Sequence, residues 1–247
     1  MKVLLINDMY KEVGGAETSV AGTRRLLLEL GHQVYFFGFG EANIENALIL
    51  PHKKNKYLKT FERFFFSYRI YKKLKGLIKE KKPDIIHLHN NYQYSVSVLL
   101  AIKHSKVPAV HTVHDWGLLC ASSWGVYRHS LHSCTLTKGI GLKCYFHEKC
   151  LPLHHFILSF IRNKLRYSLE NSTISYFTPP STTLTKDLSN FNFFPVTTLH
   201  HFIEFSKSKK VKRENNLILY VGALTKNKGV EFLIKAMESS KTIYSFH

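Results

Sequence analysis

Short apolar runs alternate along this chain with longer segments in which apolar residues recur at helical spacing. The runs predict strands at residues 3–6, 33–37, 85–88, 107–112, 174–177 and 196–199. The helical spacing predicts helices at residues 16–30, 94–104, 153–170 and 183–189, and Gly31 suits the end of the first helix. Strands that alternate with helices in this way indicate an α/β fold, a Rossmann-like parallel sheet with helices on both faces.

A polar and basic stretch at residues 205–216 divides the sequence into two parts. A strand at 217–221, a loop at 222–229 and a helix at 230–237 then form a fresh βα unit. We therefore expect an N-terminal Rossmann-like domain at 1–204, followed at 205–247 by a linker and the start of a second Rossmann-like domain. Because a lone βα unit cannot bury both faces of its sheet, the second domain is expected to be incomplete.

The composition is that of a globular protein, with 45% hydrophobic and 21% charged residues among 247. Disorder, collagen-like repeats and coiled coils are poor fits to it. Lys and Arg number 35 against 17 Asp and Glu, and the formal net charge of +18 indicates an anionic partner: phosphate, nucleic acid or an acidic membrane surface. No signature of a nucleic-acid-binding module accompanies the charge, so no nucleic acid is expected as a partner.

The sequence also bears on the cellular compartment. No apolar run approaches the roughly 18 residues that span a bilayer. The apolar start Val3–Ile6 is too short for the core of a signal peptide. We therefore expect a cytoplasmic protein.

The positive charge concentrates at residues 53–82, where apolar residues again recur at helical spacing. The apolar stripe consists of Phe61, Phe64, Phe65, Tyr68, Ile70, Tyr71, Leu74, Leu77 and Ile78. One interpretation is a basic amphipathic helix that docks on anionic lipid at the inner membrane face, with a second basic helix at 156–169 extending the surface. The alternative is a core-facing helix with a solvated basic face.

Two glycines, Gly14 and Gly15, stand between the first expected strand and the first expected helix. Glycine lets the backbone approach a ligand closely, and a helix start presents free N–H groups that favour phosphate. Glu17 is a candidate accessory residue in the same turn. The pattern is not G-x-G-x-x-G, so it predicts no dinucleotide site, and a flexible strand-to-helix turn is the alternative interpretation.

A histidine and an aspartate, His114 and Asp115, follow the strand expected at 107–112. A histidine at a strand end can hydrogen-bond a sugar or stabilise charge near a phosphate, and Asp115 could fix its tautomer. These two residues are the candidate catalytic pair. The alternative is a histidine that merely packs or faces solvent.

The loop at 222–229 also lies between a strand and a helix start, and it contains Lys226 and Lys228. A lysine before a helix N-terminus adds a point charge to the helix dipole, which suits a diphosphate. Lys228 is the candidate phosphate-binding residue and Lys226 a candidate accessory one. The alternative is an ordinary surface lysine in a turn.

Four cysteines fall within a single segment near residues 116–152. They are Cys120, Cys134, Cys144 and Cys150. In a reducing compartment such clustering suggests thiols or a metal rather than disulfides. A structural zinc held by four thiolates is one interpretation, with His132 or His147 as substitute ligands; free or partly oxidised thiols are the other, because the paired C-x2-C spacing is absent.

Taken together, these motifs resemble the GT-B glycosyltransferases of family 4. The Gly14–Glu17 loop, the D-I-I-H-L-H run at 84–89 and the T-V-H-D turn at 112–115 are similar to motifs of that family. The segment from Leu219 to Ala236 resembles its G-R-L-x-x-x-K-G signature. The order and spacing agree across nearly the whole chain, and the cysteine-bearing segment stands where some relatives carry an insertion.

The resemblance implies two Rossmann-like domains that face each other across a cleft, with residues 1–204 as the acceptor side. It implies transfer of a sugar from a nucleotide-sugar donor to a glycan or lipid-linked acceptor, with retention of configuration and no metal at the donor phosphates. Gly14 and Gly15 would lie against the donor phosphate and the acceptor. His114 would lie beside the transferred sugar, and Lys228 would neutralise charge on the leaving diphosphate.

Two departures from the family pattern qualify these expectations. Ala223 stands where the family usually has an arginine, so one phosphate cation is missing or is supplied by another residue such as Lys226. The family's E-x7-E motif would lie beyond His247, and residues 239–247 do not continue the pattern. We expect a truncated enzyme with little or no activity by itself; the alternative is a non-catalytic basic module that binds a membrane surface or a partner.

Overall fold

The structure is a computed structural model in which the placement of most residues can be described. The described residues are 1–10, 14–40, 44–52, 55–92, 94, 96–120, 123, 125–126, 134, 142–146, 150, 152–202, 217–225, 228–239 and 245–246. They belong to two compact units, unit 1 at Met1–Phe202 and unit 2 at Ile203–His247. Each unit is described by itself.

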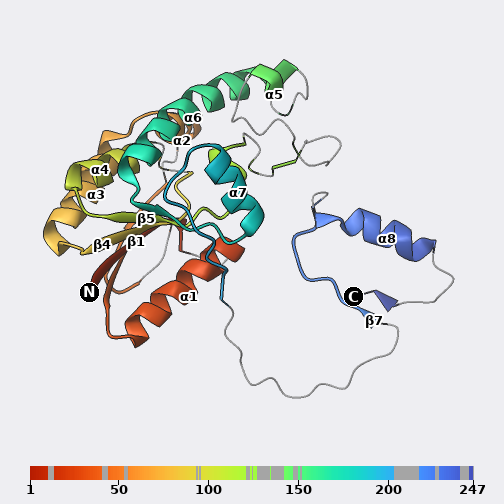
Figure 1. Ribbon diagram of the computed structural model, residues 1–247, viewed down its shortest axis with the longest axis horizontal. Helices are drawn as coiled ribbons and strands as arrows, with labels where there is room; N and C mark the ends of the chain where they lie inside the picture. The colour runs from red at the N-terminus through yellow and green to blue at the C-terminus, as the bar shows by residue number, and fades with distance from the viewer. Residues whose placement is uncertain are drawn as a thin grey trace. The chain divides into compact units, whose positions relative to one another are not determined.

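Unit 1 is built on a six-stranded parallel sheet, which confirms the predicted Rossmann-like α/β fold (Figure 1). The strands are β1 (Lys2–Met9), β2 (Gln33–Phe39), β3 (Ala47–Leu50), β4 (Ile85–Leu88), β5 (Ala109–His111) and β6 (Tyr176–Phe177). Their order across the sheet is β3-β2-β1-β4-β5-β6. The chain therefore reverses direction of winding at β1, and β1 and β4 lie side by side at the centre.

Helices cover both faces of this sheet (Figure 1). The α-helices in the described part of unit 1 are α1 (Gly15–Glu29), α2 (Lys56–Phe64), α3 (Tyr68–Lys81), α4 (Ser97–Ser105), α5 (Leu142–Phe146), α6 (Leu153–Thr173) and α7 (Thr182–Asn190), of which α5 lies beyond the outer end of α6, away from the sheet. Successive side chains of a strand point to opposite faces. In β1, Val3 and Leu5 pack in the core on the α1 side, whereas Leu4 and Ile6 join the larger core with α3 and α4. A strand that is buried on both faces needs a continuous apolar run, and β1 has one from Val3 to Ile6.

The sequence did not predict β3, and it ended β1 too early. β1 continues through Met9, with a register shift between Ile6 and Met9, and it carries Asn7 and Asp8 into the buried interior. The polarity of these two residues suggested a turn. They are instead buried because they hydrogen-bond the loop after β4, as described below.

The helix expected at 94–104 begins at Ser97. Tyr94 is fully buried, its hydroxyl donates to the carbonyl of Asn7 at 2.7 Å, and its ring stacks on Phe39 at 4.8 Å. These contacts hold Tyr94 in the core, outside the regular helix. The strand expected at 196–199 is also reduced, to a single parallel bridge between Val196 and Phe177.

The basic stretch at 53–82 is two helices, so the prediction of one continuous amphipathic helix was wrong. The break lies between α2 and α3, where Ser67 caps α3 by accepting from the backbone N–H of Ile70. Ile70 and Leu74 of α3 are fully buried. α3 is therefore the core-facing helix of the alternative interpretation, although its first residue, Tyr68, is exposed, whereas α2 buries Phe64 and leaves Tyr57, Leu58 and Phe61 exposed.

Unit 2 contains a two-stranded parallel sheet and one helix in its described part. β7 (Leu217–Ile218) pairs with β8 (Ser245–Phe246), and α8 spans Val230–Glu238. Large apolar side chains of this unit are exposed, Val221 by 86% and Phe232 by 79%. The assignment of residues 205–247 to a donor-binding domain stays a prediction.

Within the described ranges, no helix combines the length and the apolar character needed to cross a bilayer.

Candidate functional site

A polar cavity of about 240 Å³ lies in unit 1, at the carboxyl ends of β1, β4 and β5. Its lining comes from the loops after these strands and from α6, and consists of Asp8, His89, Asn90, Asn91, Tyr92, His111, Val113, His114, Asp115, Gly117, Leu118, Ser123 and Arg166. Ligands of open parallel sheets bind at this edge. The cavity thus includes both candidate catalytic residues, His114 and Asp115.

Two buried polar residues of β1 shape the loop after β4. The Asn7 side-chain oxygen accepts from the backbone N–H of Asn90 at 2.9 Å. The Asp8 carboxylate accepts from the backbone N–H of Tyr92 at 2.9 Å. Since buried polar groups must be hydrogen-bonded, these contacts fix the loop and explain why two polar residues, Asn7 and Asp8, are buried near the end of β1.

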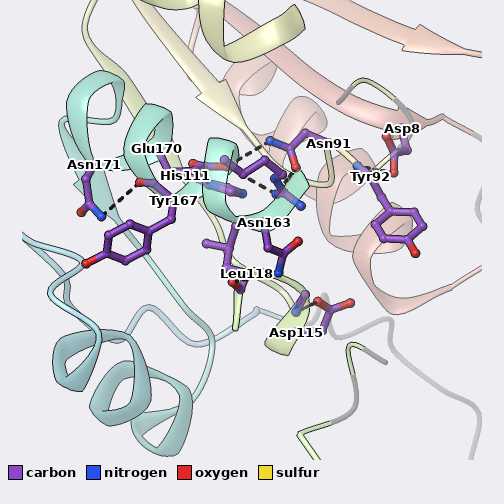
Figure 2. Close-up of polar contacts among 12 residues, drawn as sticks. Asp8, Asn91, Tyr92, His111, Asp115, Leu118, Asn163, Tyr167, Glu170 and Asn171 are labelled. Atoms are coloured by element: carbon purple, nitrogen blue, oxygen red, sulfur yellow. Dashed lines mark hydrogen bonds and ion pairs between the residues drawn. The ribbon is translucent and has the colours of Figure 1, made fainter. Parts of the chain in front are cut away.

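The floor of the cavity is a network around Glu170 of α6 (Figure 2). The Glu170 carboxylate is fully buried and accepts from His111 Nδ1 at 2.9 Å and from Asn91 Nδ2 at 3.1 Å. Arg166, one helical turn earlier, approaches the same carboxylate at 3.4 Å and also donates to Asn91. The network joins β5, α6 and the loop after β4.

Opposing effects act on the pKa of Glu170. Burial by itself would raise this pKa, but the hydrogen bond and charge of His111, together with Arg166 and Asn91, lower it overall. The carboxylate is therefore ionised in the folded protein, and it is the counter-charge for Arg166.

A second cationic side chain, Arg162, lies one turn before Arg166 on α6 and is also buried. Its guanidinium stacks 4.3 Å from the centre of the Tyr92 ring, and Arg63 of α2 stacks 3.8 Å from that centre. Burial, reinforced by the nearby charge of Arg166, lowers the pKa of Arg162 to about 9. The cavity wall at Tyr92 is thus backed by positive charge.

Three histidines and a serine form a hydrogen-bonded chain along the cavity edge. His89 Nδ1 lies 3.0 Å from His114 Nε2, and His114 Nδ1 lies 3.1 Å from His201 Nε2. His201 Nδ1 in turn lies 3.1 Å from Ser19 Oγ of α1. The chain runs from His89, which is 1% exposed, to the exposed residue His201.

Burial keeps these imidazoles neutral. It lowers the pKa of His114 to about 3, with a further contribution from His201. It lowers the pKa of His89 well below the usual value, and that of His87, which lies beside His89, to about 4. Each neutral ring carries one N–H and one acceptor nitrogen, so each ring both donates and accepts.

Asp115 does not hold the His114 ring in the described contacts. Its carboxylate accepts from the backbone N–H of Gly117 at 2.7 Å and caps the short 3-10 turn Trp116–Leu118. Burial raises the pKa of Asp115, against the lowering effect of that hydrogen bond. The prediction that Asp115 fixes the tautomer is corrected, because consecutive residues point apart and His89 and His201 occupy the two ring nitrogens.

Gly14 and Gly15 lie at the start of α1, outside the lining of the cavity. A Cβ on Gly15 would meet nothing within 4 Å, whereas one on Gly14 would stand 3.0 Å from the Glu17 carboxylate. Gly14 has φ −154°, an extended conformation open to any residue. The backbone of the turn does not require glycine at Gly14, the Glu17 carboxylate lies beside the helix start, and the role of the two glycines in phosphate binding stays a prediction.

The predicted cation of unit 2, Lys228, is exposed and directly precedes Gly229, which caps α8 with φ +74°. Lys226 lies outside the described residues. The role of Lys228 at the donor diphosphate stays a prediction.

The four cysteines are all partly buried. Among the described residues, no group of three or more His, Cys, Asp or Glu could hold a metal ion. The zinc site and the free or partly oxidised thiols both stay open interpretations of the cysteine segment. His132 and His147 lie outside the described residues.

The sequence did not predict the network that supports the site. Glu170 is the one acidic residue of α6, in a helix otherwise rich in Arg and Lys, and this contrast was the available signal. Arg166 was counted only as surface charge. His201 carried no signal, because it reaches His114 from 87 residues away.

The family model of Glycosyltransferase Family 4 matches residues 13–207. The chain belongs to this family. The matched range contains the Gly-Gly turn, the histidine chain and every lining residue of the cavity except Asp8. The family assignment thus confirms the resemblance carried by the motifs.

Solved structures similar to this family 4 chain share its fold. An α-glucosyltransferase in complex with UDP and a 13-mer DNA containing a HMU base is 14% identical, with 97% of this chain and 54% of that chain covered and a TM-score of 0.52. The same kind of enzyme in complex with UDP is 13% identical, with 97% and 55% covered and a TM-score of 0.52. These proteins are GT-B enzymes, and at such identity the likeness shows the fold.

A relative in sequence is an uncharacterized 42.6 kDa protein in the cps region of Klebsiella pneumoniae. It is 25% identical, and the match covers 71% of this chain and 56% of the relative. The chain thus spans about half the length of the proteins that it matches.

Proposed function

We propose that the chain carries the acceptor-side domain of a retaining glycosyltransferase, which transfers a sugar from a nucleotide-sugar donor to a glycan or lipid-linked acceptor. The observation that supports this most strongly is the family match over 13–207, with a polar cavity at the sheet edge inside it. The proposed reaction needs no cofactor, because fixed cations and N–H groups can neutralise the leaving diphosphate.

Each candidate residue has a part in this proposal. Gly14 and Gly15 let the donor phosphate approach the start of α1, where free N–H groups favour an anion. This requires the Glu17 side chain to move away from Gly14. His114 lies beside the transferred sugar, Asp115 holds the turn that follows it, and Lys228 faces the leaving diphosphate.

The lining of the cavity suits an acceptor rich in hydroxyl groups. Asp8, Asn91 and Arg166 offer carboxylate, amide and guanidinium groups, and Tyr92 offers an aromatic face. Such planar polar groups donate to and accept from hydroxyls. The cps-region relative makes a polysaccharide the first acceptor class to test.

UDP is the first donor nucleotide to test, because the similar α-glucosyltransferase structures contain it. One of them also contains DNA, and a basic protein binds nucleic acid non-specifically through phosphate. We propose no nucleic acid as a partner of this chain. A 13-mer oligonucleotide at physiological salt is therefore a control that should show no retention.

A membrane surface is the second proposed partner. Tyr57, Leu58 and Phe61 of α2 are exposed by 85%, 52% and 56%, on a chain of net charge +18. Exposed aromatic and apolar residues among lysines favour an anionic interface. The protein would then be cytoplasmic and peripheral at the inner membrane face. Vesicle binding without UDP binding would favour a non-catalytic membrane module instead.

Calorimetric titration of the purified chain with UDP tests the leading proposal. The wild-type chain should bind UDP, and Gly15→Ala should weaken binding about tenfold, or about 1.4 kcal/mol, because the new methyl group occupies space meant for phosphate. Gly76→Ala is the matched control, since Gly76 of α3 also has nothing within 4 Å of an added Cβ. Absence of UDP binding by the wild type, or equal affinities of all three, would contradict the phosphate role.

A further inference from the structure

Both ring nitrogens of His114 are already engaged in the structure. Nε2 faces His89 Nδ1 at 3.0 Å, and Nδ1 faces His201 Nε2 at 3.1 Å. The ring of His114 lies edge to edge with the rings of its two partners, at a centroid distance of 5.3 Å and an interplanar angle of 24° from His89, and at 5.0 Å and 31° from His201. The ring is thus held in orientation from two sides.

The protons of this chain are not independent of one another. Three neutral rings carry three N–H protons, and each of the two ring-to-ring hydrogen bonds uses one. The third proton lies at one end of the chain. It is either on His89 Nε2, with the Ser19 hydroxyl donating to His201 Nδ1, or on His201 Nδ1, donating to Ser19 Oγ.

The buried end of the chain decides between these two arrangements. His89 Nε2 is fully buried and has no hydrogen-bond partner among the described residues. An orphaned buried N–H is rarer in proteins than an under-used acceptor. The favoured arrangement therefore leaves His89 Nε2 without a proton. His89 Nδ1–H then donates to His114 Nε2, His114 Nδ1–H to His201 Nε2, and His201 Nδ1–H to Ser19.

We propose that His201 is a positioning residue for His114, which holds the His114 ring in orientation by accepting from its Nδ1–H, while His89 sets the proton on Nδ1. His201 is the next-to-last residue of unit 1, and it reaches His114 from a different segment than the strand that carries it. This inference deepens the proposed function, on which it rests for the place of His114 beside the sugar. The direction of the hydrogen bonds from His89 to Ser19 follows from contacts within unit 1 alone.

The arrangement sets what a ligand can do at His114. A hydroxyl group that contacts Nδ1 must take the place of His201, and it meets an N–H, so its oxygen accepts. His114 would then act on the donor sugar as a hydrogen-bond donor, and not as a base.

Nitrogen-15 NMR of the histidine rings tests this directly. In the wild-type chain at neutral pH, His114 should show a protonated Nδ1 and an unprotonated Nε2. His201→Ala should leave the tautomer, which His89 sets, but should expose the His114 Nδ1–H to water and broaden its proton resonance by exchange. His201→Gln should restore a sharp resonance, because the amide oxygen can accept from Nδ1–H. His200→Ala is the matched control, since His200 contacts the carbonyl of Pro180 and takes no part in the chain.

Unchanged backbone amide spectra would show that the variants remain folded, so that a broadened resonance reports on the ring alone. The proposal is overturned if His114 carries its proton on Nε2 in the wild type, or if the Nδ1–H resonance of His201→Ala is as sharp as that of the wild type. Neither of these NMR results would change the outcome of the UDP titration. If the wild-type chain fails to bind UDP, the tautomer of His114 is unaffected, and only its proposed contact with a sugar is withdrawn.

Discussion

Glu170 illustrates how one side chain can determine the order of a whole site. Its carboxylate accepts from His111 of β5, from Asn91 in the loop after β4 and from Arg166 of its own helix. A buried charge is tolerated only when it is paired and hydrogen-bonded. Each partner therefore depends on Glu170, and so does the floor of the cavity.

Substitution of Glu170 by glutamine should be strongly destabilising. Glutamine keeps the shape but removes the negative charge, so Arg166 is left as an uncompensated buried cation, and we expect a loss of about 3 kcal/mol. Urea unfolding followed by circular dichroism at pH 7 measures the change. Glu80→Gln is the control, because Glu80 is 67% exposed and pairs only with Lys81. The control should change by less than about 0.5 kcal/mol. Equal midpoints for the two variants would mean that the network adds no stability.

At the scale of elements, the sequence predicted the helices and strands whose bounds depend on nearby residues. It missed bounds that are set by contacts between residues far apart in the chain. β4 was predicted with its observed bounds, Ile85–Leu88, because a central parallel strand must be apolar throughout. α1 was predicted to within a residue, and Gly31 takes the expected positive φ of +77°. In contrast, the start of α4 depends on the burial of Tyr94 against Asn7, 87 residues away. Such a contact leaves no local pattern.

The same reasoning applies to the candidate site. His114 could be predicted because a strand end is a position in the sequence as well as in the fold. The partners that determine its chemistry, His89 and His201, come from two other segments. The pairing of Glu170 with His111 likewise joins residues 59 apart.

α2 differs from α3 in what it leaves exposed, and this yields a prediction about the element. The double variant Leu58→Ser, Phe61→Ser should bind vesicles that contain phosphatidylglycerol about tenfold more weakly than the wild type, since it removes about 1–2 kcal/mol of apolar contact. Co-sedimentation with vesicles measures binding. Leu30→Ser is the control, because Leu30 is 63% exposed but follows α1. Binding should also fall steeply with salt. Binding that ignores the anionic lipid content would count against a membrane role for α2.

At the scale of the whole molecule, the balance of charge makes acid conditions unfavourable. The chain has a net charge of +18 with histidine neutral, and it contains 15 histidines. Each histidine that gains a proton adds to the self-repulsion of the folded state. The buried histidines of the site add a second and more specific effect, since folding holds them neutral.

Stability should therefore fall as the pH falls below about 6.5, the ordinary histidine pKa. The folded pKa values of His87 and His114 are lowered to about 4 and about 3, so between pH 6.5 and those values the unfolded chain binds more protons than the folded one. Their stabilising effect is complete above pH 6.5 and is lost as the pH falls from there toward the folded pKa values. At pH 5.5 each should account for a loss of about 1.4 kcal/mol, and His89 adds to it in the same direction. Urea unfolding at pH 7.5 and 5.5 measures the difference, which should shrink in His87→Asn and persist in the exposed-site variant His200→Asn. An equal free energy of unfolding at the two pH values would contradict this prediction. It would mean that protonation of these buried rings costs the folded protein no stability.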